Sequence, residues 1–157
     1  MIPLLDEDEQ LTTEENAYYI GVDYAPSIRL ANKKAPILTC TRKEDRYTTK
    51  ESLGNGLLTH PVGLLTADEI FFAGGTEYVG NDKYYLYSGG SFWTSTSLGS
   101  YGIGGVDADA WCVNDDGSIS SAGIGADYGV RPVINLRADA KFTGNGSFET
   151  PYVITVK

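Results

Sequence analysis

The pattern of apolar and polar positions predicts a chain built mostly from short strands. Runs of β-branched and aromatic residues alternate with clusters of glycine, asparagine and aspartate, which is typical of strands joined by turns. In the first half, strands are expected at residues 28–30, 35–41 and 46–49. More runs follow in the second half, where strands are expected at residues 84–87, 92–96, 110–113, 118–120, 129–136 and 152–156. Because Pro132 cannot donate to a ladder, its strand belongs at a sheet edge or a bulge.

One helix start stands out in this β-rich pattern. Thr66 precedes Glu69 by three residues, the spacing of a capping box in which each residue bonds the other's backbone amide. Asp68 and Glu69 in the first turn also suit the helix dipole. Residues 70–72 supply an apolar face, and the glycines at 74–75 end the helix after about two turns. The sequence therefore predicts a short helix directly after Thr66.

The order of the expected elements predicts an α+β domain. Asp116-Gly117, within residues 114–117, separates two alternating runs and favours a hairpin turn. A second, weaker helix is expected near residues 11–17. Mixed strands, a short helix and then a run of strands are typical of α+β domains. The 157 residues fit one domain, with residues 1–17 as an acidic N-terminal segment and residues 18–157 as the single folded unit.

Charge excludes several classes of partner. The formal net charge is −9, and no basic stripe suited to nucleic acid or to an anionic membrane is apparent. Part of the acid is local, and a solvated terminus is expected at Asp6, Glu7, Asp8, Glu9, Glu14 and Glu15. No apolar run reaches transmembrane length and no signal peptide is visible. If the native protein is anchored or secreted, this chain is a fragment or a mature form.

The two cysteines leave two alternatives open. Cys40 and Cys112 are too few for a disulfide framework or a zinc site. They could pair with each other in an oxidising compartment, or be two ordinary buried thiols.

Several segments carry a resemblance to a known family. Residues 92–97, 109–113, 116–119 and 128–136 resemble the C-terminal part of C-type-lectin-fold domains related to the formylglycine-generating-enzyme and sulfatase-modifying group. Upstream and terminal segments resemble a subset of that group on bacterial surface and pilin-like proteins, and they lie at residues 35–40, 63–69, 73–75 and 144–154. The resemblance covers most of residues 18–156. It implies a C-type-lectin-like fold with mixed short strands and one or two short helices.

The same fold is used by the variable proteins of diversity-generating retroelements. In them, exposed positions near the C-terminus vary at adenines, and residues 95–128 here have the matching content of Tyr, Ser, Asn, Asp, Gly and Ala. Such residues make a good binding surface, although ordinary loops of a β-domain contain them too. The resemblance implies a non-catalytic domain on a cell surface, outside the cell or on a phage particle, which recognises a protein or glycan on another cell or virus through residues 94–128. The candidate ligand-binding residues are Thr94, Ser95, Ser97, Ser100, Tyr101, Asp107, Asp109, Trp111, Asn114 and Tyr128.

The alternative is a structural pilin-like or surface assembly subunit, and oligomers are compatible with either function. No enzymatic activity is expected, because neither cysteine maps onto the cysteine pair of the formylglycine-generating enzymes. No metal or cofactor is expected either. The spacing from Trp111 to Asn114 differs from the Trp-Asn-Asp calcium motif of sugar-binding lectins, and residues 114–116 are better explained as a turn.

Single residues have structural explanations. His60, before Pro61, is expected to be a packed or surface histidine. Arg131 lies inside an apolar strand, so an ion pair is expected, with Asp127 or Asp139 as the acids near it in sequence. Core packing is expected for both tryptophans, with the alternative that one of them borders the binding face.

Overall fold

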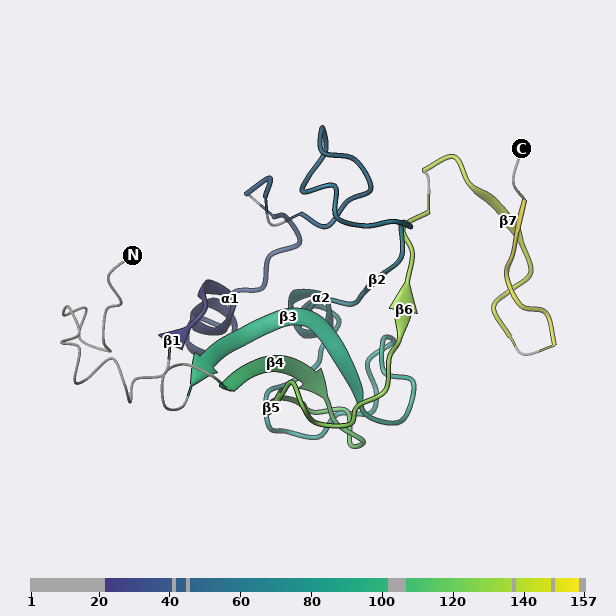
Figure 1. Cartoon of the computed structure of the whole chain (residues 1–157). Coiled ribbons are helices and arrows are strands. Elements are labelled where there is room, and N and C mark those ends of the chain that lie inside the picture. The colour runs from purple at the N-terminus through teal and green to yellow at the C-terminus, as the bar shows by residue number, and fades with distance from the viewer. Residues whose placement is uncertain are drawn as a thin grey trace, which may run out of the picture.

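The computed structural model describes residues 22–40, 42–44, 46–101, 107–136, 138–147 and 149–155, and it has a mixed α+β architecture (Figure 1). The elements in chain order are β1 (Val22–Asp23), α1 (Ala25–Ser27), the π-helix η1 (Ile28–Asn32), β2 (Gly63–Leu64), α2 (Ala67–Phe72), β3 (Phe92–Tyr101), β4 (Asp107–Val113), β5 (Ile119–Gly123), β6 (Pro132–Val133), β7 (Lys141–Thr143) and β8 (Val153–Thr155). Short antiparallel strands and two short helical segments confirm the predicted α+β class. The expected helix at 11–17 and the acidic segment 1–17 lie outside the described residues.

The centre of the molecule is a four-stranded antiparallel sheet in the order β1-β3-β4-β5. Its longest strand, β3, pairs with β4 along one edge. Three separate segments cover the other edge. Gly129 accepts a bond from the Trp93 amide (3.0 Å), Leu65 accepts from the Ser95 amide (2.9 Å), and β1 pairs with residues 99–100. Strand β3 is therefore an interior strand held by parts of the chain that are distant in sequence.

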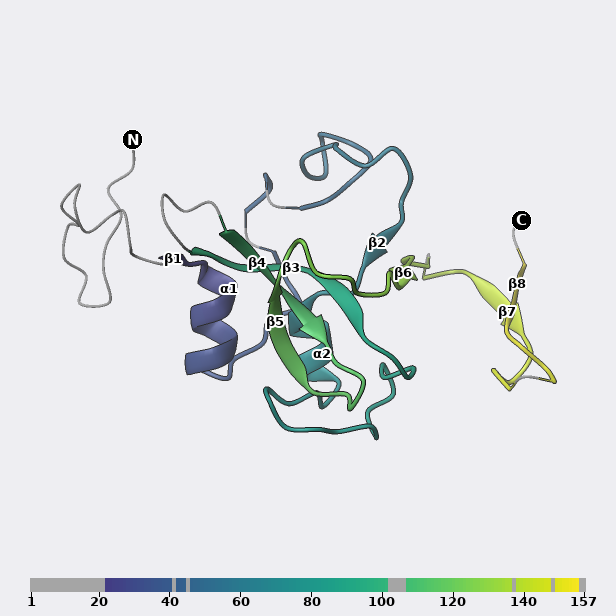
Figure 2. The same ribbon diagram turned by 60° about the horizontal axis from the view of Figure 1, so that its bottom comes forward.

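The hydrophobic core lies on one face of this sheet. Trp111 is fully buried and meets the ring of Phe71 edge-on, with 5.7 Å between ring centroids. Leu30 from η1 and Ile70 from α2 pack in the same cluster, so both helical segments cover the same face (Figure 2). The cluster also contains Leu65, Ala67, Tyr84, Phe92, Val113 and Ile119. A core on one face only leaves the opposite face of the sheet to other uses.

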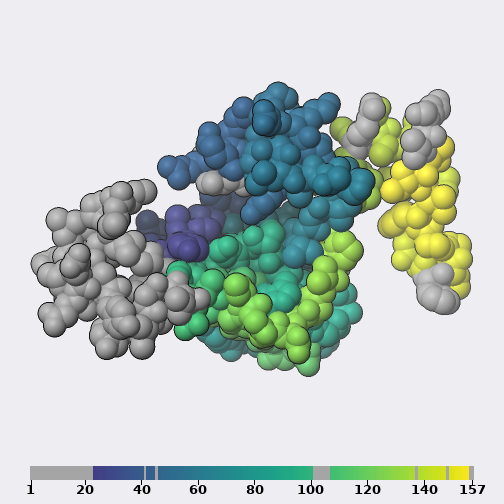
Figure 3. All heavy atoms as spheres, in the orientation of Figure 1, coloured from purple at the N-terminus to yellow at the C-terminus, as the bar shows by residue number. Residues whose placement is uncertain are grey.

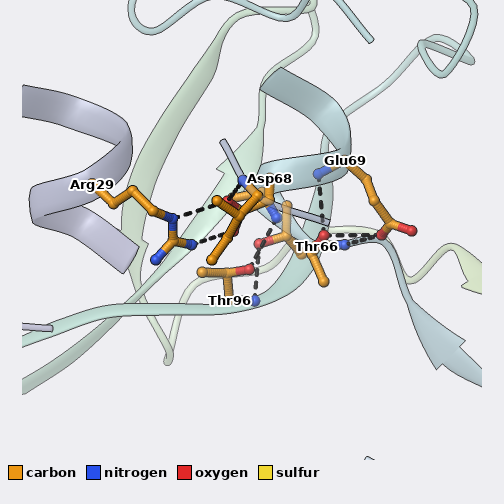
Figure 4. A network of polar contacts seen from close by, with 8 residues as sticks. Arg29, Thr66, Asp68, Glu69 and Thr96 are labelled. Atoms are coloured by element: carbon orange, nitrogen blue, oxygen red, sulfur yellow. Dashed lines mark hydrogen bonds and ion pairs between the residues drawn. The ribbon is translucent and has the colours of Figure 1, made fainter. Parts of the chain in front are cut away.

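Helix α2 confirms the predicted capping box. The Thr66 hydroxyl accepts from the Glu69 amide at 3.1 Å, and the Glu69 carboxylate accepts from the Thr66 amide at 2.8 Å. The next amide, that of Ala67, donates to Thr96 Oγ1 of β3 at 2.9 Å. These bonds satisfy backbone donors that a helix start leaves without partners, and they fix α2 on the sheet (Figure 4).

The carboxylate of Asp68 ties two further segments to α2. Arg29 donates to it twice, from Nε at 3.2 Å and from Nη2 at 2.6 Å. The backbone amide of Ile37 donates to the same carboxylate at 2.8 Å. Because Asp68 is largely buried, these bonds satisfy a charge that would otherwise be costly to desolvate (Figure 4).

The hairpin turn predicted at residues 114–117 is confirmed. The Gly117 amide bonds to the Asn114 carbonyl at 2.9 Å, and the Asn114 amide bonds to the Ser118 carbonyl at 2.9 Å. Gly117 has a φ of +78°, and a Cβ there would collide with the carbonyl oxygen of Asn81. The turn therefore requires glycine for conformation and for space.

Three strands expected in the first half are absent. Residues 28–30 are helical, because Pro26 in the first turn of α1 starts a helix that buries Leu30 and leaves Ile28 exposed. Residues 35–40 are irregular, since the Ile37 amide bonds to a side chain instead of a ladder. Residues 46–49 belong to a loop closed by bonds from the Asn55 and Leu58 amides.

Except at residues 84–87, the later expected strands are present but differ in length. Residues 84–87 form a turn, with a 3.0 Å bond from the Tyr87 amide to the Tyr84 carbonyl. The strand expected at 129–136 shortens to β6, which pairs only with β2, so Pro132 does lie at a sheet edge. The expected last strand is present as β8.

Strands β7 and β8 form a two-stranded ribbon that lies apart from the four-stranded sheet (Figures 1 and 2). Phe142 faces Ile154 in the register, and the Phe142 and Tyr152 rings meet with 5.1 Å between centroids. All three side chains are exposed. An isolated two-stranded ribbon is only marginally stable in water.

Replacing Asp68 with Asn should destabilise the fold. The change removes the charge that holds Arg29 and weakens the bond to the Ile37 amide, so we expect a loss of about 2–3 kcal/mol in the free energy of unfolding. Urea denaturation followed by tryptophan fluorescence measures it. The control is Asp82→Asn, an exposed carboxylate beside Lys83, for which the denaturation midpoint should stay nearly unchanged. Equal stability of the two variants would contradict the role given to Asp68.

Candidate functional site

The face of the sheet turned away from the helices forms a separate surface, which we call the outer face. Directly opposed residues of antiparallel strands project from the same side. Phe92, Val113 and Ile119 oppose one another and point into the core, so the alternate positions point outward. The outer face accordingly consists of Trp93, Ser95, Ser97, Ser100, Ala108, Ala110, Cys112, Ser120 and Ala122.

Most side chains of the outer face are small. Ser95 and Ser97 are exposed, while Ala108, Ala110 and Ala122 are half-buried. None of these side chains extends far from the sheet, so a partner can approach the strands closely. The surface is smooth and weakly polar, with hydroxyl groups but no charged side chain among its members.

An aromatic pair closes one end of the outer face. The segment after β5 returns over the sheet and places the Tyr128 ring on Trp93, with 4.7 Å between centroids. The Tyr128 hydroxyl donates to Asn114 Oδ1 at 3.3 Å, and Ser120 Oγ donates to the same oxygen at 3.2 Å. This amide oxygen therefore fixes both a sheet residue and the aromatic cover.

Beneath the aromatic pair lies the Cys112 thiol, which is fully buried. Its sulfur is 3.3 Å from Ser120 Oγ and 3.5 Å from the Ser120 carbonyl oxygen. A hydrogen bond with this thiol, followed by burial, raises the pKa of Tyr128. The phenol therefore stays protonated at neutral pH and keeps its bond to Asn114.

The structure divides the ten predicted ligand-binding residues into three groups. Five share the outer face or its aromatic end, namely Ser95, Ser97, Ser100, Asn114 and Tyr128. Tyr101 and Asp107 oppose each other at the loop end of β3 and β4, next to the pair formed by Gly99 and Asp109. Asp107 is exposed and Asp109 half-buried, while the side chain of Tyr101 lies outside the described residues.

Thr94 and Trp111 are the two predicted residues that need correction. Thr94 is 5% exposed, and its hydroxyl donates to the Trp111 carbonyl at 2.7 Å. Trp111 is 0% exposed and lies in the core. In this structure neither side chain reaches a surface, because both project from the helix-covered side of the sheet. Trp93 is the tryptophan that borders the outer face.

Sequence reasoning missed the alanines of β4 and β5 that complete the outer face. The alternation in residues 107–113 marks two sets of positions but does not tell which set faces outward. That choice is decided by the packing of Trp111 and Val113 against Leu30 and Ile70, which come from segments distant in sequence, and no local motif marks it.

The carboxylate oxygens of the turn at residues 114–117 accept hydrogen bonds from other residues of the chain. The Ser118 amide donates to Asp116 Oδ1 at 2.9 Å, and hydrogen bonding from Ser118 lowers the pKa of Asp116. Ser91 donates to the Asp115 carboxylate. Among the described residues, no group of three or more His, Cys, Asp or Glu side chains is arranged to hold a metal ion.

The other single-residue expectations have mixed outcomes. Cys40 is exposed and Cys112 buried, and both are free thiols, so the disulfide alternative is wrong and the alternative of buried thiols holds for Cys112 only. His60 is a surface histidine. Arg131 bonds to the Leu86 carbonyl and lies 5.3 Å from the centre of the Phe92 ring. The ion pairs found between described residues do not include Arg131, because a carbonyl and an aromatic face stabilise its charge instead.

None of the helices formed by the described residues combines the length and the apolar composition needed to cross a membrane. Comparison of the chain with protein-family models, with curated proteins and with solved structures yields no match. The outer face, with its aromatic end, is thus identified as a candidate site from its geometry alone.

Proposed function

We propose that this chain is a non-catalytic binding domain of C-type-lectin-like type, displayed on a cell surface or a phage particle, and that its outer face recognises a protein or glycan. The observation that carries the proposal is the outer face itself. It is a sheet surface that no helix of the described residues covers, rich in Ser and Ala and bordered by Trp93 and Tyr128.

The chemistry of this face suits recognition of a broad partner. Small hydroxyl-bearing side chains adapt their hydrogen bonds, and a tyrosine adds a large contact area with few rotors to immobilise. A tryptophan–tyrosine edge suits stacking against an apolar side chain or a sugar ring. The core behind β3 and β4 holds the strands in place, so little ordering is needed on binding.

A bulky charge at the centre of the outer face should abolish binding. In the variant Ser97→Arg, a long cation stands in the middle of the small-residue surface and prevents close approach, so we expect at least about a tenfold loss of affinity. A printed glycan array and suspensions of intact bacterial cells serve as probes, with the fluorescently labelled domain as the reporter.

The matched control is Ser52→Arg, which makes the same change at an exposed serine of the loop before β2. Both variants should keep the melting temperature within about 2 °C, because exposed substitutions rarely disturb folding. Binding that survives Ser97→Arg, or a wild-type domain that binds no probe, would count against the outer face.

Diversification by a retroelement makes a separate prediction. If the domain is a variable protein, substitutions among natural copies of the gene should cluster at adenine-containing codons for the exposed positions between 94 and 128. Codons for the buried Thr94 and Trp111 should be constant, since changes there would damage the core. Deep sequencing of a native population measures this. Even variation along the gene would remove the retroelement from the proposal and leave a fixed binding domain.

A specific observation also favours the alternative of a surface assembly subunit. The β7–β8 ribbon exposes Phe142, Tyr152 and Ile154 together, and it stands apart from the rest of the described chain. Three or more strands with a covered apolar face are normally needed for a stable sheet. Pairing of ribbons between subunits would meet that need.

Assembly through the ribbon is tested by Phe142→Asp. A carboxylate on the apolar side should prevent association, so concentration-dependent oligomers of the wild-type chain in analytical ultracentrifugation should disappear. Thr143→Asp is the control, because Thr143 opposes Val153 on the other side of the ribbon. A wild-type chain that stays monomeric at all concentrations would contradict the alternative.

A further inference from the structure

Positive charge is concentrated in one stretch of this acidic protein. Six of its twelve Lys and Arg residues lie within residues 33–50, a stretch that we call the basic loop. They are Lys33, Lys34, Arg42, Lys43, Arg46 and Lys50. Only Glu44 and Asp45 oppose them in the same stretch, which gives the basic loop a net charge of +4 in a chain whose total is −9.

The basic loop presents this charge to solvent. All six basic residues are exposed. Between described residues, its one ion pair joins Lys34 to Glu77 at 2.5 Å, and Arg46 Nε donates to the Cys40 carbonyl at 2.8 Å. The later residues of the stretch belong to the blue atoms at the top of the molecule in Figure 3. The basic loop is therefore an exposed cationic segment that the described chain leaves largely uncompensated.

The same chain contains the complementary charge. Residues 6–15, which we call the acidic segment, hold six carboxylates and no Lys or Arg. We propose that the acidic segment docks on the basic loop of its own chain through ion pairs. This inference does not depend on the outer face or on the function proposed for it.

The connection is long enough for this contact. Seven residues lead from Glu15 to Val22, which spans about 23 Å when extended. The helical stretch from Ala25 to Asn32, which separates β1 from the basic loop, is about 12 Å long. The acidic segment is therefore long enough to reach the basic loop at Lys33.

Tethering makes weak ion pairs effective. Exposed pairs are individually weak and are screened by salt. A segment joined by a short linker nevertheless stays at a local concentration in the millimolar range. The docked segment thus neutralises the basic loop, and an outside acidic partner has to displace it before it can bind there.

The chain offers its own position for a probe. Cys40 is an exposed free thiol inside the basic loop, with Arg46 bonded to its carbonyl, whereas Cys112 is fully buried. A nitroxide can therefore be attached to Cys40 alone, and mass spectrometry of the native protein confirms a single label. Paramagnetic broadening of the backbone amide signals of residues 6–15 then reports their distance from the basic loop.

We expect strong broadening of the amide signals of the acidic segment at low ionic strength. It should disappear in 1 M salt, where the screening length falls to about 3 Å. It should also disappear in a full-length variant in which all six carboxylates are neutralised, namely Asp6→Asn, Glu7→Gln, Asp8→Asn, Glu9→Gln, Glu14→Gln and Glu15→Gln. The matched control carries the nitroxide on Thr143→Cys in a Cys40→Ser background, which places the label on the β7–β8 ribbon and should leave residues 6–15 unbroadened.

Three results would overturn the proposal. The first is a set of sharp amide signals from residues 6–15 at low salt in the Cys40-labelled protein. The second is broadening that persists in 1 M salt or in the neutralised variant. The third comes from mixing isotope-labelled chains that carry no nitroxide with unlabelled chains that carry one. Broadening of the amide signals of residues 6–15 in that mixture would place the acidic segment on a second copy.

Discussion

The arrangement of this domain depends on the carboxylate of Asp68. That group lies in the first turn of α2, where it accepts two bonds from Arg29 and one from the Ile37 amide. The neighbouring Ala67 amide is bound to Thr96 of β3. One short helix start therefore joins η1, the segment after it and the central strand. Because these contacts all lie on the same side of the sheet, the described part of the chain gathers its helices there and leaves the opposite side without helical cover.

This one-sided arrangement gives adjacent residues of β4 opposite surroundings. Trp111 points into the core against Phe71, while Cys112 points outward and is buried only because Tyr128 and Trp93 lie at that end of the outer face. Farther along, Ala110 and Ala108 have no such cover and remain half-exposed. The outer face thus changes along a single strand from a packed aromatic end to an open small-residue surface, and its shape follows from where the return segment after β5 crosses the sheet.

Local features of this fold could be predicted from sequence, and those set by distant contacts could not. The capping box of Thr66 and Glu69 and the turn at Gly117 need only a few neighbouring residues, and both are present as predicted. Residues 28–30 have strand-like composition, yet Pro26 and the burial of Leu30 make them helical. The segment proposed for binding includes most of the outer face, but sequence reasoning places Thr94 and Trp111 at the surface. The side on which they lie is decided by packing against η1 and α2, which are distant from them in sequence.

The outer face and the basic loop rest on different physical interactions, and this difference separates them experimentally. The outer face has hydroxyl, methyl and aromatic groups supported by a packed core, so contacts made there depend on shape and respond weakly to ionic strength. The basic loop has exposed cations with few internal partners, so contacts made there are screened as salt rises. An acidic partner whose affinity falls steeply with salt is therefore expected to bind the basic loop, where it competes with the acidic segment, even if it also touches the outer face. A partner that binds the outer face should be insensitive to salt, and docking of the acidic segment should leave its affinity unchanged.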